Sequence, residues 1–379
     1  MNRVCYWINI QFRIASAWYV VEDEFELTIL DSGDPTRAIV MARAGFDQAV
    51  ESFSDLDLKS FVAFRTLLSD AAGGRALVRP TALQLEQFGR GLFDLVVRND
   101  IQRIYNRLPQ SHIRLKIYSN RSDVQGLPWE YIQEPNCVPG PNAFRSVVRV
   151  VPTIGVPAPV AKNMGQILRM LFVYAEPPRS SSTDWPTIKA SIETKFKARL
   201  PQKNFELDVV EGATKDSFTA AFRSKKYDIL HMVCHGAIEA DGSGSLLFQD
   251  IKGKSSESIP ASALGAFLKD KELRVVVLSA CNTAAGNFAR EFAVVAKTLV
   301  QNSVPAVVAN QFEIENSAAA AFAGGFYAEL LVSGDLDRAT TKGRMELVFG
   351  GALPNNAAKI DWGIPTLYRH LGASQAFKP

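Results

Sequence analysis

The sequence has few cysteines and no long apolar run, and both shortages narrow the class of protein. Four cysteines in 379 residues, at positions 5, 137, 234 and 281, have no regular spacing, so they predict no disulfide framework and favour a reducing compartment. No stretch approaches the ~20 apolar residues that cross a bilayer. Asn9, Gln11 and Arg13 interrupt the apolar N-terminus, which therefore does not resemble a signal peptide. We expect a cytoplasmic protein without membrane contact.

Runs of one charge and internal repeats are also missing. The formal net charge is only +3, and no basic run exceeds two or three residues, of which Lys225 and Lys226 are the most obvious. Scattered lysines and arginines are typical of a solvated surface, so we expect no direct contact with nucleic acid. No repeat of solenoid period is visible.

The sequence does not favour a metal or a phosphate site. His231, Cys234 and His235 are close in sequence, but strand residues four apart on one face are separated by about 13 Å, and strand neighbours point to opposite faces. The glycine-rich stretch 241–245 lacks the lysine and the following helix of a phosphate-binding loop. We expect neither a metal nor a cofactor.

What the sequence does contain is an alternation of short apolar runs and amphipathic segments in its larger C-terminal part. The apolar runs are rich in β-branched residues, as buried parallel strands are. The alternation predicts an α/β fold with a mostly parallel sheet and helices on both faces. The predicted strands are 167–174, 205–210, 228–233, 275–281 and 304–311. A hairpin-like piece is predicted at 242–250, between the third and the fourth of these strands. The predicted helices are 185–199, 214–222, 261–269, 288–300, 317–331 and 335–349.

The first 151 residues show a different pattern, and we expect them to form an α+β lobe. In the strand predicted at 112–118, Ile113 and Leu115 alternate with Arg114 and Lys116, which indicates that one face is solvated. A single core stops growing near ~250–300 residues, which favours two lobes. Further strands are predicted within 1–30 and over 146–151, a helical region over 81–108, a proline-rich connector over 152–162 and a second domain over 163–379.

Two of the predicted strands end in residues that can carry nucleophilic chemistry. One is followed by Cys234, His235 and Gly236, and the other ends at Cys281. In open α/β sheets chemistry collects outside the carboxyl ends of the strands, so neighbouring strands would bring imidazole and thiol to one edge. Alone, a cysteine there is typically a small buried hydrophobe and a histidine a turn residue. Together, they predict a Cys/His dyad.

In this dyad His235 would withdraw the proton of Cys281, and the thiolate would attack a peptide carbonyl to form a thioester that water releases. The backbone N–H groups of Gly236 and Cys281 are the expected oxyanion donors, because a glycine after the histidine allows close approach of the backbone. No third member is obvious. Glu239 and Asp241 follow His235 closely, but a backbone carbonyl could orient the ring equally well.

The residues around the dyad resemble the signature blocks of the CHAT family, which are caspase-like cysteine peptidases often fused to or encoded near TPR proteins. As in caspases, the histidine precedes the cysteine by roughly fifty residues. The residues Ser-Ala-Cys-Asn-Thr replace the caspase pattern Gln-Ala-Cys-x-Gly, so no preference for Asp before the cut is implied. The similar blocks are YDILHMVCHG at 227–236, VVVLSACNTAAG at 275–286, LPWEYI at 127–132, VPAVVANQFEIENSAAAAFAGGFYAELL at 304–331 and DWGIPTLY at 361–368.

The resemblance implies a caspase-like fold, a protein substrate, and an activating sensor or TPR-type partner in regulated bacterial signalling or defence. It also implies that substrate groups lie along the strand ends, at Gln311, Phe312 and Glu313, with Asp241 on the rim. A buried Glu313 would favour a basic residue before the scissile bond, whereas an exposed one would be an ordinary loop carboxylate. Two other functions stay open, a catalytically silent interaction scaffold and, less favoured, a Cys/His acyl transferase or amidase.

Overall fold

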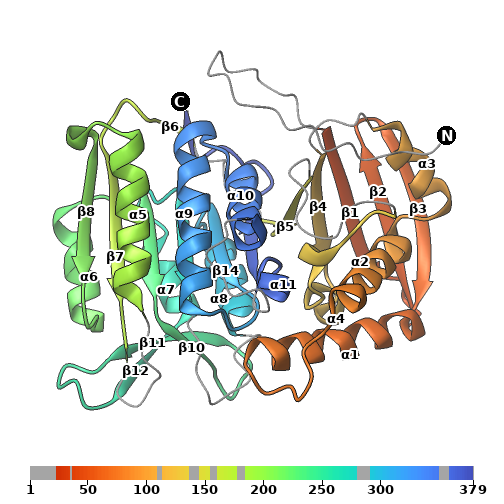
Figure 1. The fold of residues 1–379 in the computed structure, drawn as a ribbon, viewed down its shortest axis with the longest axis horizontal. Coiled ribbons are helices and arrows are strands. Elements are labelled where there is room, and N and C mark those ends of the chain that lie inside the picture. The colour runs from red at the N-terminus through yellow and green to blue at the C-terminus, as the bar shows by residue number, and fades with distance from the viewer. Residues whose placement is uncertain are drawn as a thin grey trace. The chain divides into compact units, whose positions relative to one another are not determined.

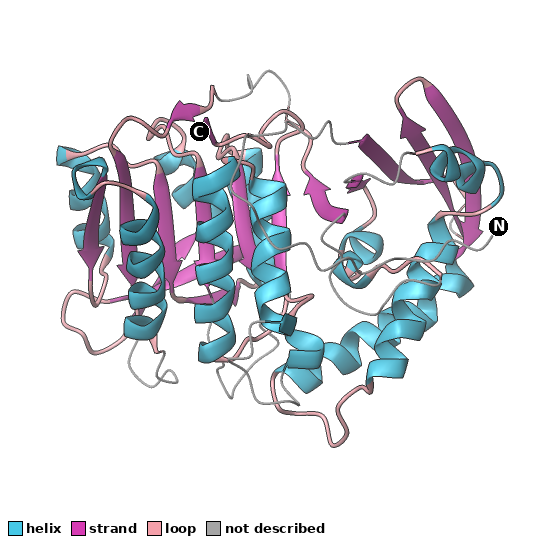
Figure 2. Cartoon of the chain, turned by 45° about the horizontal axis from the view of Figure 1, so that its top comes forward, coloured by secondary structure: helices cyan, strands magenta, loops and turns pink. Residues whose placement is uncertain are grey.

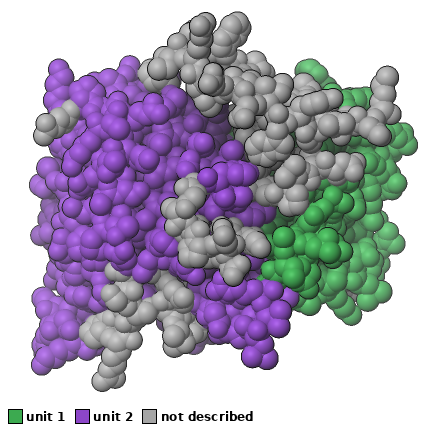
Figure 3. All heavy atoms as spheres, in the orientation of Figure 1, with its two compact units in different colours: residues 1–65, 80–147 green, residues 66–79, 148–379 purple. Residues whose placement is uncertain are grey.

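The computed structural model describes residues 23–34, 36–108, 113–135, 145–153, 160–176, 184–279, 291–349 and 358–378. The chain forms two compact units (Figure 3). Unit 1 contains residues 1–65 and 80–147, and unit 2 contains residues 66–79 and 148–379. The central part of the expected proline-rich connector, residues 154–159, lies outside the described residues. The lobe boundaries expected from the sequence, 1–151, 152–162 and 163–379, stay a prediction.

Unit 1 has an α+β architecture built on strands in the order β3-β2-β1-β4. Strand β1 pairs in parallel with β4, and the other pairs are antiparallel. The predicted helical region at 81–108 is two helices, separated at Val97 and Arg98, and Thr81 begins the first with a capping box. The elements are β1 (Asp23–Asp31), β2 (Arg37–Ala44), β3 (Asp47–Ser54), α1 (Asp55–Ala72, ending in unit 2), α2 (Ala82–Val96), α3 (Asn99–Arg107), β4 (Ile113–Ser119), α4 (Ser122–Gln125) and the short 3₁₀ helix η1 (Trp129–Tyr131).

The prediction that one face of β4 is solvated is wrong. Arg114 and Lys116 are only 8% and 5% exposed. Their charged groups reach carboxylates of the neighbouring strand: Lys116 Nζ lies 2.7 Å from Glu24 Oε2 and 3.3 Å from Glu26 Oε1. Basic side chains can bury their stems when the charged head is paired. Alternation of apolar and charged residues therefore does not by itself identify a solvated face.

Unit 2 is built on a sheet with the strand order β5-β15-β14-β13-β9-β7-β8 (Figure 1). All pairs in it are parallel except β14 with β15, which confirms the predicted α/β fold with a mostly parallel sheet. Two small sheets accompany it, β10-β11-β12 and β16-β6. The strands are β5 (Arg145–Val150), β6 (Lys162–Asn163), β7 (Leu168–Tyr174), β8 (Phe205–Val210), β9 (Ile229–Val233), β10 (His235–Ile238), β11 (Gly244–Gln249), β12 (Ser256–Pro260), β13 (Val275–Ser279), β14 (Ala306–Asn310), β15 (Pro365–Arg369) and β16 (Phe377–Lys378).

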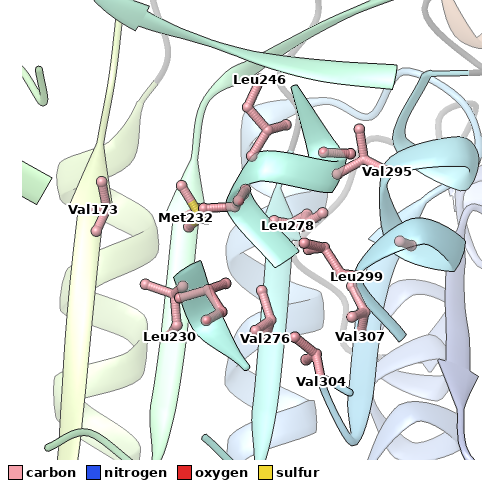
Figure 4. Packing of buried hydrophobic residues seen from close by; sticks show 14 of the residues in the cluster. Val173, Leu230, Met232, Leu246, Val276, Leu278, Val295, Leu299, Val304 and Val307 are labelled. Carbon is pink, nitrogen blue, oxygen red and sulfur yellow. The ribbon is translucent and has the colours of Figure 1, made fainter. Parts of the chain in front are cut away.

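Helices cover both faces of this sheet, as predicted, and lie along its strands (Figures 1 and 2). On one face, Leu230 and Met232 of β9 join a core with Leu278 of β13 and with Val295 and Leu299 of α8 (Figure 4). Among the described residues, no helix combines the length and the apolarity of a membrane span. The helices of unit 2 are α5 (Trp185–Arg199), η2 (Gln202–Asn204), α6 (Lys215–Ser224), α7 (Ala261–Leu268), α8 (Glu291–Gln301), α9 (Asn316–Ser333), α10 (Leu336–Phe349) and α11 (Ala358–Asp361).

Candidate active site

The strands β9 and β13 are neighbours, which is the condition for the predicted dyad, and they are in parallel register from Ile229 with Val275 to Val233 with Ser279. One further bond continues the ladder, because the N–H of Cys234 donates to the carbonyl of Ser279 at 3.3 Å. The two carboxyl strand ends thus lie at the same edge of the sheet. His235 and Cys281 each come two residues after these paired ends in the sequence, but residue 281 lies outside the described residues.

His235 is the first residue of β10 and is buried, with 4% of its surface exposed. Its Nε2 is shielded from solvent and has no hydrogen-bond partner among the residues that the structure describes. Burial lowers the pKa of His235 below its ordinary value, because the charged imidazolium loses hydration. The ring is therefore neutral at neutral pH, and an unprotonated imidazole nitrogen can accept a proton.

The two carboxylates considered as a third member are engaged elsewhere. Asp241 is exposed in the turn after β10, and its Oδ1 accepts the N–H of Ser243 at 2.9 Å, which together with the Ser243 hydroxyl holds its pKa below the ordinary value. Glu239 accepts the hydroxyl of Ser258 at 2.6 Å. Gly236 is buried within β10. Its role as an oxyanion donor, and that of Asp241 at the rim, stay predictions.

A second histidine, His231, lies in the middle of β9 and takes part in a buried polar network. Its Nδ1 is 2.9 Å from the hydroxyl of Tyr327 on α9, and its Nε2 is 3.2 Å from the hydroxyl of Ser279. The ring stacks on Phe172 of β7, with the centroids 5.3 Å apart. Complete burial lowers the pKa of His231 to about 3, so the ring is neutral. This network holds the last described residue of β13 in place.

The loop after β14 carries the residues predicted to contact substrate, and the structure fixes it firmly. Gln311 is buried; its side-chain amide donates to the carbonyl of Gly363 at 2.5 Å, and its backbone N–H donates to the carbonyl of Ile364 at 2.9 Å. Arg149 donates to the side-chain oxygen of Gln311 at 3.2 Å. Phe312 is 3% exposed. Since β14 pairs with β13, this loop begins beside the strand that precedes Cys281.

Glu313 is buried, so its interpretation as a solvent-exposed loop carboxylate is wrong. Only 2% of its side chain is exposed, and its Oε1 lies 2.7 Å from Nη1 of Arg75. Its Oε2 is shielded from solvent and finds no hydrogen-bond partner among the described residues. A buried carboxylate with one unsatisfied oxygen can accept a further hydrogen bond from a cationic ligand.

Asp361 is a buried carboxylate that the sequence analysis assigned no role. It is 4% exposed, and its Oδ2 has no partner in the part of the chain that the structure describes. Burial raises the pKa of Asp361 to about 7; the charge of Glu315 raises it further, and that of Arg79 lowers it. In the sequence, Asp361 is marked only by its position as the first residue of DWGIPTLY, the block at 361–368 that resembles the family. The described residues hold no group of three His, Cys, Asp or Glu side chains arranged to bind a metal.

A comparison with protein families gives one match. The family model of the CHAT domain matches residues 91–369, which include both His235 and Cys281. The matched range covers nearly three-quarters of the chain and includes parts of both units. No curated protein matches the chain in sequence.

The chain is also similar to solved structures at low identity. Two structures of the separase–securin complex of Saccharomyces cerevisiae match with 9% and 10% identity and TM-scores of 0.45 and 0.47, each covering 92% of this chain. The chain spans 30% of the length of those matched chains. A complex of the Porphyromonas gingivalis RgpB pro- and mature domains matches with 10% identity and a TM-score of 0.43, covering 85% of this chain and 77% of that one. Likeness at this level says nothing about the site.

Proposed function

Because the chain belongs to the CHAT domain family, whose members are caspase-like, we propose that it is a cysteine endopeptidase that cleaves a partner protein with a Cys/His dyad. His235 is the general base and Cys281 the nucleophile. The observation that carries this proposal is the parallel register of β9 and β13. Both strands end at the same edge of the sheet, and His235 and Cys281 each follow two residues after the end of their strand.

The chemistry follows from a neutral imidazole beside a thiol. His235 takes the Sγ proton of Cys281, and the thiolate attacks the scissile carbonyl, while the N–H groups of Gly236 and Cys281 stabilise the oxyanion. The imidazolium then gives its proton to the departing amine, which leaves a thioester on Cys281. Water attacks the thioester after losing a proton to His235, and the acid product and the free thiol result. Burial lowers the pKa of His235, so the ring is unprotonated at neutral pH and available to take the thiol proton.

We place the first specificity pocket at Gln311, Phe312 and Glu313, with Asp241 at its rim. The burial of Glu313 supports a basic residue before the scissile bond, because a cation would pair with a carboxylate that is already out of water. The substrate is a protein, and activation by a sensor or a TPR-type protein in bacterial signalling or defence fits the family.

The test is a positional peptide library incubated with the full chain and two variants, Cys281→Ala and His235→Ala. Both variants should lose cleavage to background while their melting temperatures stay near that of the wild type, since neither change empties a large core volume. Cys234→Ala, which alters a buried cysteine one residue from His235, is the matched control and should keep activity.

The opposite result, activity in Cys281→Ala and none in Cys234→Ala, would reassign the nucleophile. The same library separates the other functions. A wild-type chain that cleaves nothing under any condition favours the interaction scaffold. Transfer of the acyl group to an added amine without cleavage of longer peptides favours the acyl transferase or amidase.

A further inference from the structure

A short segment of the chain places an arginine against the proposed specificity pocket. Residues 66–79 belong to unit 2, although the chain on both sides of them belongs to unit 1. The segment contains the end of α1 and the stretch Gly-Gly-Arg-Ala-Leu-Val-Arg from Gly73 to Arg79. We infer that Arg75 occupies the pocket at Glu313 in place of a basic substrate side chain, which must displace it to bind. This inference rests on the proposed function, because it names the internal competitor of that site.

The contact between Arg75 and Glu313 joins a partly exposed guanidinium to an enclosed carboxylate. Nη1 of Arg75 lies 2.7 Å from Oε1 of Glu313; the arginine side chain is 31% exposed and the glutamate side chain 2%. The guanidinium is thus partly open to solvent while its partner is enclosed. On its outer side the same guanidinium reaches Oδ1 of Asp70 at 3.5 Å and the carbonyl of Ser69 at 3.3 Å.

Arg75 bonds to only one of the two carboxylate oxygens of Glu313. A guanidinium can donate two parallel hydrogen bonds to the two oxygens of one carboxylate, and this bidentate pairing is the stronger arrangement. Here only Oε1 of Glu313 is engaged, and Oε2 is buried without a partner among the described residues. An arginine that enters from another direction can satisfy both oxygens, so an incoming side chain can bind better than Arg75 does.

A second arginine of the segment, Arg79, is exposed, and its charge acts on a second buried carboxylate. Arg79 lies close enough to Asp361 to lower its pKa, against the larger effect of burial and the charge of Glu315. Oδ2 of Asp361 is also buried without a partner among the described residues. Arg75 thus pairs with a buried carboxylate and the charge of Arg79 acts on another, and opposite charges are what a basic peptide ligand would need at these positions.

The stretch from Gly73 to Arg79 has few contacts that would prevent it from moving away from Glu313. Between Gly73 and Arg79 it has neither helix nor strand, and the apolar residues Leu77 and Val78 are 104% and 73% exposed. Segments with little buried apolar surface open at a small cost in free energy. Its described backbone bonds lie at its start, where the N–H groups of Arg75 and Ala76 both donate to the carbonyl of Asp70. Arg75 can thus swing out while α1 remains in place.

Binding tests the inference without requiring cleavage. The probe is the blocked peptide AAGGRALVRP, which copies residues 71–80, titrated by calorimetry into full-length Cys281→Ala with and without Arg75→Ala. Removal of the internal competitor should tighten binding by about tenfold or more, since the competent fraction of pockets rises. Citrulline in place of the peptide's first arginine, or Glu313→Gln in the protein, should remove the gain. Arg169→Ala is the control for removal of a partly exposed arginine, because Arg169 is 35% exposed and pairs at 3.0 Å with Glu206, a carboxylate that is itself 38% exposed.

Equal affinity with and without Arg75→Ala, or a gain that survives Glu313→Gln, would overturn the inference. Arg75→Ala fails as a test if the chain does not fold with Glu313 buried and unpaired, and Arg75→Lys then takes its place. A lysine makes one weaker contact with Glu313, so the peptide should bind more tightly than to the parent chain, by a smaller factor than expected for Arg75→Ala. Unchanged affinity in Arg75→Lys would count against the inference. In the active chain, Arg75→Ala should lower KM for arginine peptides more than it raises kcat. Tighter binding in a chain that cleaves nothing would reject the proposed function alone, whereas cleavage with unchanged KM and affinity would reject the competitor alone.

Discussion

At the scale of single residues, the two cysteines next to the proposed catalytic residues should differ in reactivity. Cys234 is fully buried in the core of unit 2. Cys281 is proposed to pair with His235, and a thiol beside a histidine is partly ionised at neutral pH. Iodoacetamide at pH 7 should therefore label Cys281 faster than Cys234, and faster than the cysteines at positions 5 and 137. Mass spectrometry of the digested protein measures each rate.

Two controls make the labelling result specific. His235→Ala should slow the reaction of Cys281 and leave the other three rates unchanged, because only the imidazole has been removed. Denaturant should bring the four rates close together. Equal labelling of all four cysteines in a folded and active preparation would contradict the proposed pairing of thiol and imidazole.

Glu313 should determine the residue before the cut. A positional library on the wild type should show cleavage after Arg or Lys, because an uncharged side chain that displaced Arg75 would leave the carboxylate buried and unpaired, at a cost of about 2–5 kcal/mol. Glu313→Gln should remove this preference. The matched control is Glu206→Gln, which breaks the pair with Arg169 at the other end of the strands.

Cleavage after Leu or Met by the wild type would reject an acidic pocket. A preference for Arg that survives Glu313→Gln would instead assign the carboxylate to another residue. Of the alternatives, Asp241 is exposed and Asp250 bonds to Ser255 and Lys254, whereas Asp361 is buried with a free oxygen among the described residues, so Asp361 would be tested next.

The candidate site residues that the sequence proposed are those whose position along the chain already carries chemical meaning, and their roles stay predictions. Glu313 follows a predicted strand, as His235 does, and strand ends are where sites form. Arg75 gave no such signal, because its partner is 238 residues away and a basic residue in a glycine-rich stretch ordinarily indicates solvent exposure. The burial of Asp361 was equally hidden, since nothing in a single sequence reports which loop covers a carboxylate.

At the scale of elements, prediction succeeded where burial on both sides left an uninterrupted apolar run. Strands β9, β13 and β14 were all located from such runs, because parallel central strands contact helices on both faces. No individual helix or strand was predicted within residues 31–80, which hold β2, β3 and α1. Most residues of β3 are partly or fully exposed, so its sequence lacks the period-two pattern that marks a strand.

A buried ion pair joins β15 to α10, beside the bond from Arg344 Nε to the carbonyl of Pro365 at 2.9 Å. Arg369 and Asp337 have side chains with 0% exposure, and their two N–O contacts are both 2.7 Å. Asp337→Ala would leave a guanidinium buried without its counter-charge, which typically costs about 3–5 kcal/mol. The free energy of unfolding in urea should fall by that amount, with no change in the denaturant slope.

Two further variants separate the charge from the packing. Replacing both partners, as Arg369→Met with Asp337→Leu, should restore much of the loss, because a well-packed apolar pair needs no desolvation of charge. Glu272→Ala breaks a surface pair in which the side chain of Lys226 is 71% exposed and that of Glu272 is 61% exposed. This change should lower the free energy of unfolding far less. A double variant as unstable as Asp337→Ala would show that the bonds from Arg369 Nη1 to the carbonyls of His370 and Leu371, both at 2.8 Å, contribute most of the stabilisation.

At the scale of the whole molecule, the candidate residues of the site all belong to unit 2, but the family domain does not coincide with that unit. His235, Glu313, Asp361 and even Arg75 of the returning segment lie in unit 2. The family match nevertheless begins at residue 91, inside unit 1. A chain cut at the boundary between the units would therefore lose both part of the family domain and the segment that carries Arg75.

The stability of the molecule should depend on pH through two buried groups that act in opposite directions. His231 has a pKa of about 3 in the folded chain, below the ordinary value of about 6.5, so the stability that depends on its neutral form is lost as pH falls toward 3. Asp361 has a pKa of about 7, above the ordinary value near 4. Its folded form binds the proton more tightly, so stability is lost as pH rises toward 7.

Asp361→Asn should therefore stabilise the chain more at pH 8 than at pH 5. The amide cannot ionise, so the difference in unfolding free energy between variant and wild type should grow by at most about 1.4 kcal/mol per pH unit between ~4 and 7, and then stay constant. Urea unfolding at pH 5, 6, 7 and 8 measures this difference, in which the contribution of His231 cancels. Asp241→Asn is the control, and its difference should stay constant from pH 5 to 8, because the pKa of that exposed carboxylate is lowered and it is ionised throughout this range. A difference that does not change between pH 5 and 8 would mean that Asp361 ionises freely in the folded chain, with water or a partner at its second oxygen.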